Sequence, residues 1–314
     1  MNVVLGIDAG GTKTVCQLAD DRGRVLAEAR GPGANLQAHG ELQVEKVIHD
    51  VMERALGDRG LAPAVICLGI AGVDRPGDAD VVTALMRRIG YKARVLVVND
   101  ALIALQAAVG DAPGVVIVSG TGSIAYGRDR HGRAARAGGW GYILGDEGSG
   151  YWIGRSALRA VLREADRRGP ATTLTPRLLA HFHVGRPQDL IHEVYYGGLR
   201  PTEIAALAAI VQAAAAEGDD VAIGILDSAS RELAAAGLSV ARRLGLLDEP
   251  ATFVLAGGIF RGVPWLVTAL EERLVQASPT AQVRRLEDEP AAGAVHLAVA
   301  ELRGGARIPR YLED

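Results

Sequence analysis

The sequence contains few cysteines and few aromatic residues. Its 314 residues include two cysteines, and aromatic side chains make up 4% of the chain. Cys16 and Cys67 both lie in apolar runs typical of buried strands. We therefore expect inert thiols and too few ligands for an iron–sulfur or other metal site. Packing must depend mainly on alanine, leucine and valine.

A strong net charge and long apolar runs are also missing. The formal net charge is −3, which gives no reason to expect nucleic acid or an anionic membrane as a partner. No apolar run reaches the ~18 residues that span a bilayer, and the N-terminus begins with a strand-like run instead of a signal peptide. We expect a cytoplasmic protein of about two domains, with no nucleic-acid or membrane partner.

The first apolar run leads directly into a glycine-rich turn. Residues Gly6 to Thr14 read Gly-Ile-Asp-Ala-Gly-Gly-Thr-Lys-Thr and lie between two strand-like runs. The Walker A pattern is absent, because no Gly-Lys-Ser/Thr motif opens a helix here. An ordinary glycine-rich hairpin with a salt-bridged aspartate would have the same residues, so the turn alone does not identify a ligand.

The side chains of this turn nevertheless suit a metal-bound polyphosphate. Gly10 and Gly11 allow backbone N–H groups to approach an anion closely. Thr12 adds a hydroxyl donor, and Lys13 adds a positive charge. Asp8 suits a hydrated Mg²⁺, which keeps most of its waters and takes few protein carboxylates.

The same pattern recurs 109 residues later in the chain. A second apolar run leads into the turn Ser119–Ser123, and the shift places Thr12 on Thr121. Internal duplication is more specific than either copy alone. It predicts two halves that hold one polyphosphate from opposite sides. Because Asp8 falls on Ile117, only the first half would hold the metal.

Other segments also place polar or small residues where strands end. On the N-terminal side strands alternate with helices, which predicts a largely parallel sheet. Asp100 follows a strand and opens a helix, where N–H groups and the helix dipole favour the anion; a simple N-cap is the alternative.

Residues 138–150 combine glycines with two acids, which is typical of a ligand loop or a structural turn. The small residues 291–294 would let the last helix pass close to another element.

Together these motifs resemble the N-acetylglucosamine kinase family, which includes the benzoyl-CoA reductase activator ATPases. The matching segments follow the expected order along nearly the whole chain: Gly6–Thr14, Asn99–Ala101, Ser119–Ser123, Gly138–Ser149 and Ala256–Gly258. The resemblance implies an α/β fold of duplicated actin-like ATPase (ribonuclease H-like) domains, with two lobes and a central cleft. The implied N-terminal lobe is residues 1–112 plus 290–314, and the implied C-terminal lobe is residues 113–289.

The resemblance also implies a function: ATP-dependent phosphorylation of the 6-hydroxyl of N-acetylglucosamine or a related amino sugar, with Mg²⁺ and as a homodimer. Asp100 becomes the catalytic base, and Asp8 the metal ligand. The implied nucleotide-binding residues are Gly10, Gly11, Thr12, Lys13, Gly120, Thr121, Gly122, Gly257 and Gly258. The implied sugar-binding residues are Asn35, Asp100, Gly139, Trp140 and Asp146.

Alternatives to this function stay open from the sequence. An ATPase that activates a partner enzyme has the same fold, but that branch uses cysteines to hold an iron–sulfur cluster, and Cys16 and Cys67 are expected inside strands. A sugar-sensing regulator would normally carry a DNA-binding segment before the first strand. Among kinases, glucosamine, N-acetylmuramic acid and glucose are alternative substrates, because the groups around an acetyl or lactyl substituent cannot be placed from sequence.

Overall fold

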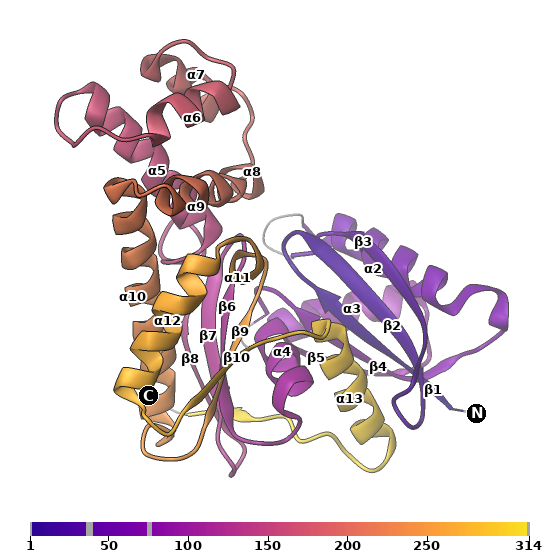
Figure 1. Cartoon of the computed structure of the whole chain (residues 1–314). Helices are drawn as coiled ribbons and strands as arrows, with labels where there is room; N and C mark the ends of the chain where they lie inside the picture. Colours follow the sequence, from indigo (N-terminus) through magenta and orange to yellow (C-terminus); the bar gives the residue numbers. More distant parts are fainter. Residues whose placement is uncertain (1, 36–39, 74–76, 313–314) are drawn as a thin grey trace.

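The computed structural model describes residues 2–35, 40–73 and 77–312, and its first part is a five-stranded sheet (Figure 1). Its strands are β1 (Val3–Ala9), β2 (Lys13–Asp20), β3 (Val25–Pro32), β4 (Pro63–Ile70) and β5 (Arg94–Asn99), and its helices are α2 (Glu41–Leu56), α3 (Asp78–Ile89) and α4 (Asp100–Val109), with a 3-10 turn at Gly57–Arg59. The strand order is β3-β2-β1-β4-β5. β1 pairs antiparallel with β2 and parallel with β4.

The second sheet repeats this topology. Its strands are β6 (Gly114–Ser119), β7 (Ser123–Arg128), β8 (Arg133–Gly138), β9 (Thr252–Ala256), β10 (Gln282–Arg285) and β11 (Arg310–Tyr311). The order is β10-β9-β6-β7-β8-β11. β6 pairs antiparallel with β7 and parallel with β9. Apart from β11, the second sheet has the order and directions of the first, so the predicted duplication is confirmed.

The hairpin turns of the two sheets also match in detail. Asp20 and Asp129, which are 109 residues apart, each accept hydrogen bonds of 2.9–3.0 Å from the backbone N–H groups two and four residues ahead. Gly23 and Gly132 take φ values of 82° and 78° in these turns, which favours glycine there. The two halves therefore share the turn between their second and third strands.

Helix α13 (Pro290–Leu302) returns to the first sheet and lies close to both β1 and α4 (Figure 1). A Cβ at Gly6 would lie 2.4 Å from the backbone nitrogen of Val295, and a Cβ at Gly293 would lie 1.9 Å from the carbonyl oxygen of Ile103. These glycines thus allow contacts that any larger residue would prevent. The predicted close approach of the last helix is confirmed.

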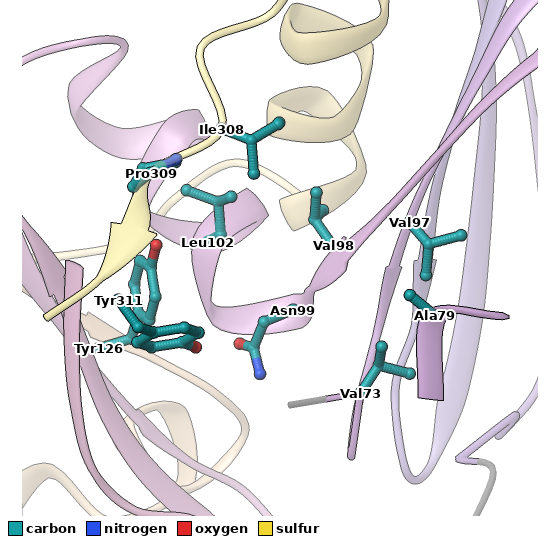
Figure 2. A pocket seen from close by; sticks show the side chains of 10 residues that line it. All are labelled: Val73, Ala79, Val97, Val98, Asn99, Leu102, Tyr126, Ile308, Pro309 and Tyr311. Carbon is teal, nitrogen blue, oxygen red and sulfur yellow. The ribbon is translucent and has the colours of Figure 1, made fainter. Parts of the chain in front are cut away.

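The residues after α13 cross to the second sheet. β11 pairs parallel with β8, because Arg310 and Leu312 donate backbone hydrogen bonds of 2.9 Å to the carbonyls of Gly132 and Ala134. The rings of Tyr311 and Tyr126 meet edge to face, with centroids 6.0 Å apart (Figure 2). The resemblance implied that residues 290–314 belong to the first lobe, whereas β11 within this range pairs with a strand of the second sheet. The lobe boundaries stay a prediction.

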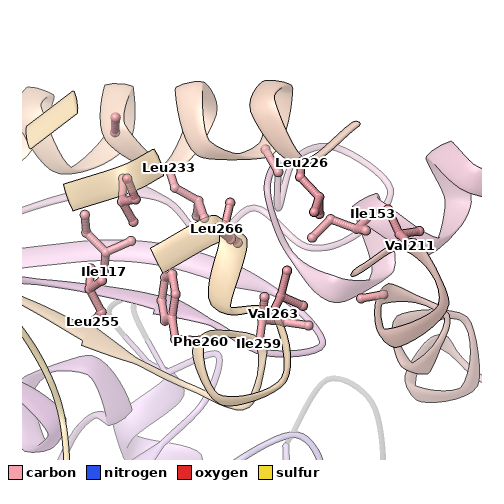
Figure 3. Close-up of a cluster of buried hydrophobic side chains, with 14 of the residues drawn as sticks. Ile117, Ile153, Val211, Leu226, Leu233, Leu255, Ile259, Phe260, Val263 and Leu266 are labelled. Atoms are coloured by element: carbon pink, nitrogen blue, oxygen red, sulfur yellow. The ribbon is translucent and has the colours of Figure 1, made fainter. Parts of the chain in front are cut away.

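The remaining helices pack on the second sheet or extend beyond it (Figure 1). They are α5 (Gly150–Ala165), α6 (Leu174–His181), α7 (Leu190–Tyr195), α8 (Pro201–Ala206), α9 (Ala208–Ala216), α10 (Asp220–Arg243), α11 (Ile259–Gly262) and α12 (Pro264–Ala277), with a 3-10 turn at Pro187–Asp189. Figure 3 shows the core between the sheet and these helices, where Ile117, Phe260 and Leu266 are buried. None of the described helices combines the length and apolarity needed to cross a membrane.

Candidate active site

The two predicted phosphate turns touch one another. The hydroxyl oxygens of Thr12 and Thr121 lie 3.2 Å apart. Each turn is closed by its own backbone, since Gly10 N–H donates to Lys13 O at 3.1 Å and Gly120 N–H donates to Gly122 O at 2.9 Å. Thr12 and Thr121, which the 109-residue shift makes equivalent, therefore bring their hydroxyl groups together from the two separate sheets.

Two carboxylates, one from β1 and one from the start of α4, gather beside the first turn. Asp8 lies at the end of β1 and is 7% exposed. Burial raises the pKa of Asp8 to about 7; the negative charge of Asp100 acts in the same direction, whereas Lys13 lowers it. Asp8, Asp100 and Lys13 are thus close enough for their charges to interact.

Asp100 is the first residue of α4, not its N-cap. The cap is Asn99, whose Oδ1 accepts a 2.7 Å hydrogen bond from the backbone N–H of Ala101. The alternative that Asp100 serves only as an N-cap is wrong, because Asn99 is the N-cap of this helix. Asp100 lies in the first turn, where the helix dipole favours a negative charge.

Glu289 is a further charged residue at this turn, and the sequence did not single it out. One of its carboxylate oxygens lies 2.5 Å from Lys13 Nζ, and the other lies 3.0 Å from an Arg30 guanidinium nitrogen. The available signal was an acid directly before Pro290, at the start of the returning helix. That signal is weak, because acids at helix starts are common for electrostatic reasons alone.

The second turn carries the loop of residues 138–150. Ser119 and Ser123 donate side-chain hydrogen bonds of 2.9 and 2.8 Å to the carbonyls of Gly148 and Glu147. Gly150 N–H donates to Gly120 O at 2.8 Å. The predicted sugar loop is therefore anchored to the predicted phosphate turn at several points.

Asp146 lies in this loop with a left-handed backbone, φ 57°. Its Oδ1 accepts a 3.2 Å hydrogen bond from Gly141 N–H. Burial raises the pKa of Asp146 to about 6, although the N–H groups of Gly141 and Ser123 oppose that shift. A Cβ at Gly122 would lie 2.5 Å from Asp146 Oδ2, so the glycine makes room for this carboxylate beside the second turn.

The predicted adenosine turn also meets the second phosphate turn. Gly257 has φ 108°, and a Cβ there would lie 2.2 Å from the carbonyl oxygen of Ser119. In contrast, a Cβ at Gly11, Gly120 or Gly258 would meet no atom of the described residues within 4 Å. Packing among those residues does not require glycine at these three positions, which is consistent with space left for a ligand.

Asn35 and Trp140 are less clearly placed. Asn35 follows Ala34, whose N–H donates to Gly10 O at 3.0 Å, so it lies beside the first turn. Gly139 N–H donates to Ser123 O at 3.0 Å, which ties the start of the sugar loop to the second turn. Trp140 is 60% exposed, and the Arg136 guanidinium lies 4.6 Å from its ring centroid. Their roles in sugar binding stay predictions.

A hollow of about 160 Å³ lies beside the start of α4 (Figure 2). It is lined by Val73, Ala79, Val97, Val98, Asn99, Leu102, Tyr126, Ile308, Pro309 and Tyr311. Asn99 is the residue before Asp100, but the predicted sugar-binding residues themselves are not part of this lining. The hollow is therefore a neighbour of the predicted site, closed on one side by the C-terminal segment.

The carboxylates present suit Mg²⁺ better than a transition metal. Within the described ranges, no cluster of three or more His, Cys, Asp or Glu side chains could enclose a metal ion. Mg²⁺ keeps several waters and needs only one or two carboxylates together with substrate phosphates, so Asp8 fits it.

Cys16 and Cys67 are buried. Burial raises the pKa of both thiols, that of Cys16 to about 12, which disfavours the thiolates that bind iron–sulfur clusters.

Comparisons with known proteins agree with this arrangement. An N-acetylmuramic acid/N-acetylglucosamine kinase from Clostridium acetobutylicum is 36% identical over 305 residues, which cover 96% of this chain and 99% of the relative. An N-acetyl-D-glucosamine kinase from Dictyostelium discoideum is 34% identical over 311 residues, with coverage of 95% and 98%. The crystal structure of a candidate N-acetylglucosamine kinase from Chromobacterium violaceum has a TM-score of 0.77 and 28% identity, and the match covers 94% of this chain and 98% of that one.

The duplicated sheets and these likenesses establish the actin-like ATPase fold of sugar kinases. Residues 5–298, nearly the whole chain, match the model of the BadF/BadG/BcrA/BcrD ATPase family. The chain belongs to the BadF/BadG/BcrA/BcrD ATPase family.

Proposed function

We propose that this protein is an ATP-dependent kinase that phosphorylates the 6-hydroxyl of N-acetylglucosamine or a related amino sugar. The observation that carries the proposal is the contact between Thr12 and Thr121, beside the electrostatically coupled Asp8 and Asp100. Full-length relatives named for this activity, at 34–36% identity, support the substrate class.

In the proposed reaction Asp100 orients the sugar hydroxyl and accepts its proton as the oxygen attacks the γ-phosphorus of ATP. The bond between that phosphorus and the β,γ-bridging oxygen breaks, and ADP leaves with the bridging oxygen. Phosphoryl transfer has a loose transition state, so alignment and charge neutralisation lower most of the barrier. The backbone N–H groups of both turns, with Lys13, hold the phosphates. Asp8 would hold Mg²⁺ through water, and the ion would supply positive charge that offsets the charge of the phosphates.

Sugar selection is assigned to Asn35, Asp146 and the start of the 138–150 loop. With a pKa of about 6, Asp146 is mostly ionised at neutral pH and accepts hydrogen bonds from sugar hydroxyls. A hydroxyl left without its partner in a closed cleft costs ~1–3 kcal/mol. The proposal includes a cytoplasmic homodimer, which rests on the family resemblance and on composition.

A coupled ADP-release assay with Mg-ATP and a panel of sugars tests the proposal. The panel contains N-acetylglucosamine, N-acetylmuramic acid, glucosamine and glucose. We expect sugar-dependent ADP release, fastest with an N-acetylated amino sugar, and a 6-phosphate product by NMR. Sugar-independent ATP hydrolysis that responds to a partner protein would contradict the kinase proposal and favour the activator ATPase.

N-Acetylmuramic acid is a second candidate substrate. The Clostridium acetobutylicum relative is named for both sugars, and the Arg136 guanidinium lies over Trp140, a predicted sugar-pocket residue. A guanidinium there would pair with the lactyl carboxylate, which N-acetylglucosamine lacks. Under this hypothesis Arg136→Gln raises KM for N-acetylmuramic acid and leaves KM for N-acetylglucosamine unchanged; equal effects on both sugars would contradict it.

A further inference from the structure

Glu289 connects the first phosphate turn to α13 through an ion-pair chain. Its carboxylate contacts Lys13 at 2.5 Å and Arg30 at 3.0 Å, and Arg30 in turn contacts Glu28 at 2.8 Å. The Glu289 side chain is 24% exposed and that of Lys13 39%. Although Glu289 precedes the first residue of α13, its side chain makes no capping hydrogen bond with the described backbone. Its carboxylate is therefore used for the two cations.

The two partners of the Lys13–Glu289 pair differ in their freedom to move. Glu289 is joined to α13, and α13 is fixed by close contacts at Gly6 and Gly293. Lys13 has a flexible four-carbon stem on a turn that faces the nucleotide site. If the pair separates, the lysine moves and the glutamate stays.

The charges around the turn favour such a separation when a polyphosphate arrives. Three carboxylates, those of Asp8, Asp100 and Glu289, interact electrostatically at this site, with Lys13 as the opposing charge. A bound polyphosphate adds further negative charge and attracts the ammonium group. Arg30 stays on the other oxygen of Glu289, so the glutamate keeps a partner after Lys13 leaves.

We propose that Glu289 is a positioning residue of the nucleotide site: it holds Lys13 in the nucleotide-free enzyme and releases it to the phosphates of the incoming nucleotide. The proposal rests on the nucleotide site of the proposed function, because it requires that Lys13 binds the phosphates of ATP or ADP. The exchange involves no covalent step. It makes Glu289 a competitor for Lys13, so removal of its charge should strengthen nucleotide binding.

The test measures the dissociation constant of Mg-ADP by calorimetry for the wild-type protein and four variants. Glu289→Gln should bind Mg-ADP about fivefold more tightly, the size of a partly exposed ion pair. The same substitution in a Lys13→Met background should change nothing, because Glu289 acts through the lysine. Lys13→Met alone should bind more weakly than the wild type.

Glu28→Gln is the matched control. It removes a carboxylate that contacts the same Arg30 and that feels the charge of Lys13 without forming an ion pair with it among the described residues, so it should change Mg-ADP affinity much less than Glu289→Gln does. Both variants lose one Arg30 contact and should lower the thermal midpoint similarly. A difference in affinity between them then reports on Lys13 and not on folding.

Two results would overturn the inference. Unchanged or weaker Mg-ADP binding by Glu289→Gln would show that the glutamate does not compete for the lysine. If Glu289→Gln also tightened Mg-ADP binding in the Lys13→Met background, the glutamate would act by repelling the nucleotide directly and not through the lysine. Failure of the proposed function is distinguishable, because it would appear as absent sugar-dependent ADP release in the wild type.

Discussion

Asp100 is the residue on which the proposed chemistry depends most. Asp100→Asn should lower kcat by at least ~100-fold, the low end for loss of a general base, and leave Mg-ADP binding intact. The fold should survive, because Asn99 supplies the helix cap. Steady-state kinetics and calorimetry check both parts. Near-normal turnover would reject the base assignment.

Asp146 should make sugar binding pH-dependent. Burial raises its pKa from 3.8 to about 6, so acidification through pH 6 removes the charge that accepts sugar hydroxyls. KM for the sugar should rise as pH falls through this range in the wild type and should stay flat in Asp146→Asn. Kinetics from pH 5 to 8 measure this, and parallel pH profiles for the two proteins would contradict it.

Asp146 should also make the free energy of unfolding depend on pH. In the unfolded chain Asp146 ionises near 3.8, below its folded pKa of about 6. Between these values the folded state binds more protons, so its contribution to stability falls as pH rises. Relative to Asp146→Asn, the wild type should therefore lose unfolding free energy from pH 4 to 6, as chemical denaturation would show.

At the scale of elements, α13 sets the spacing between β1 and α4. A Cβ at Gly293 would lie 1.9 Å from Ile103 O, so Gly293→Ala must push α13 away from the helix that carries Asp100. Overpacking of this kind costs ~1–3 kcal/mol, and kcat should fall as well. Urea denaturation measures the loss. His296→Ala, at an exposed position of the same helix, is the control and should change neither quantity.

The repeated turns could be predicted from sequence because the 109-residue shift is visible in the residues themselves. The sequence could not decide whether Asn99 or Asp100 caps the helix, since both residue types are good N-caps. Contacts of Glu289 depend on where α13 returns, which no local pattern encodes. β11 is two residues long, too short for an alternating strand pattern.

For the whole molecule, the C-terminal segment joins the two halves behind the site. α13 packs against the first sheet, whereas β11 pairs with β8 of the second. Between them, Ile308 and Pro309 help to line the hollow beside Asn99 (Figure 2). Lobe closure around a substrate is a common way to exclude water from phosphoryl transfer, and we expect this segment to limit how the two sheets can move relative to one another.

Tyr311 anchors that segment, because its ring packs edge to face on Tyr126, which is 2% exposed. Such aromatic pairs contribute ~0.5–1.5 kcal/mol beyond buried area. Tyr311→Ala should therefore lower the unfolding free energy by about 1 kcal/mol and speed hydrogen exchange at the amides of Arg310 and Leu312, which pair with β8. Tyr311→Phe, which keeps the ring, should have a smaller effect. Unchanged exchange at these two amides in Tyr311→Ala would mean that backbone pairing alone holds the segment to the second lobe.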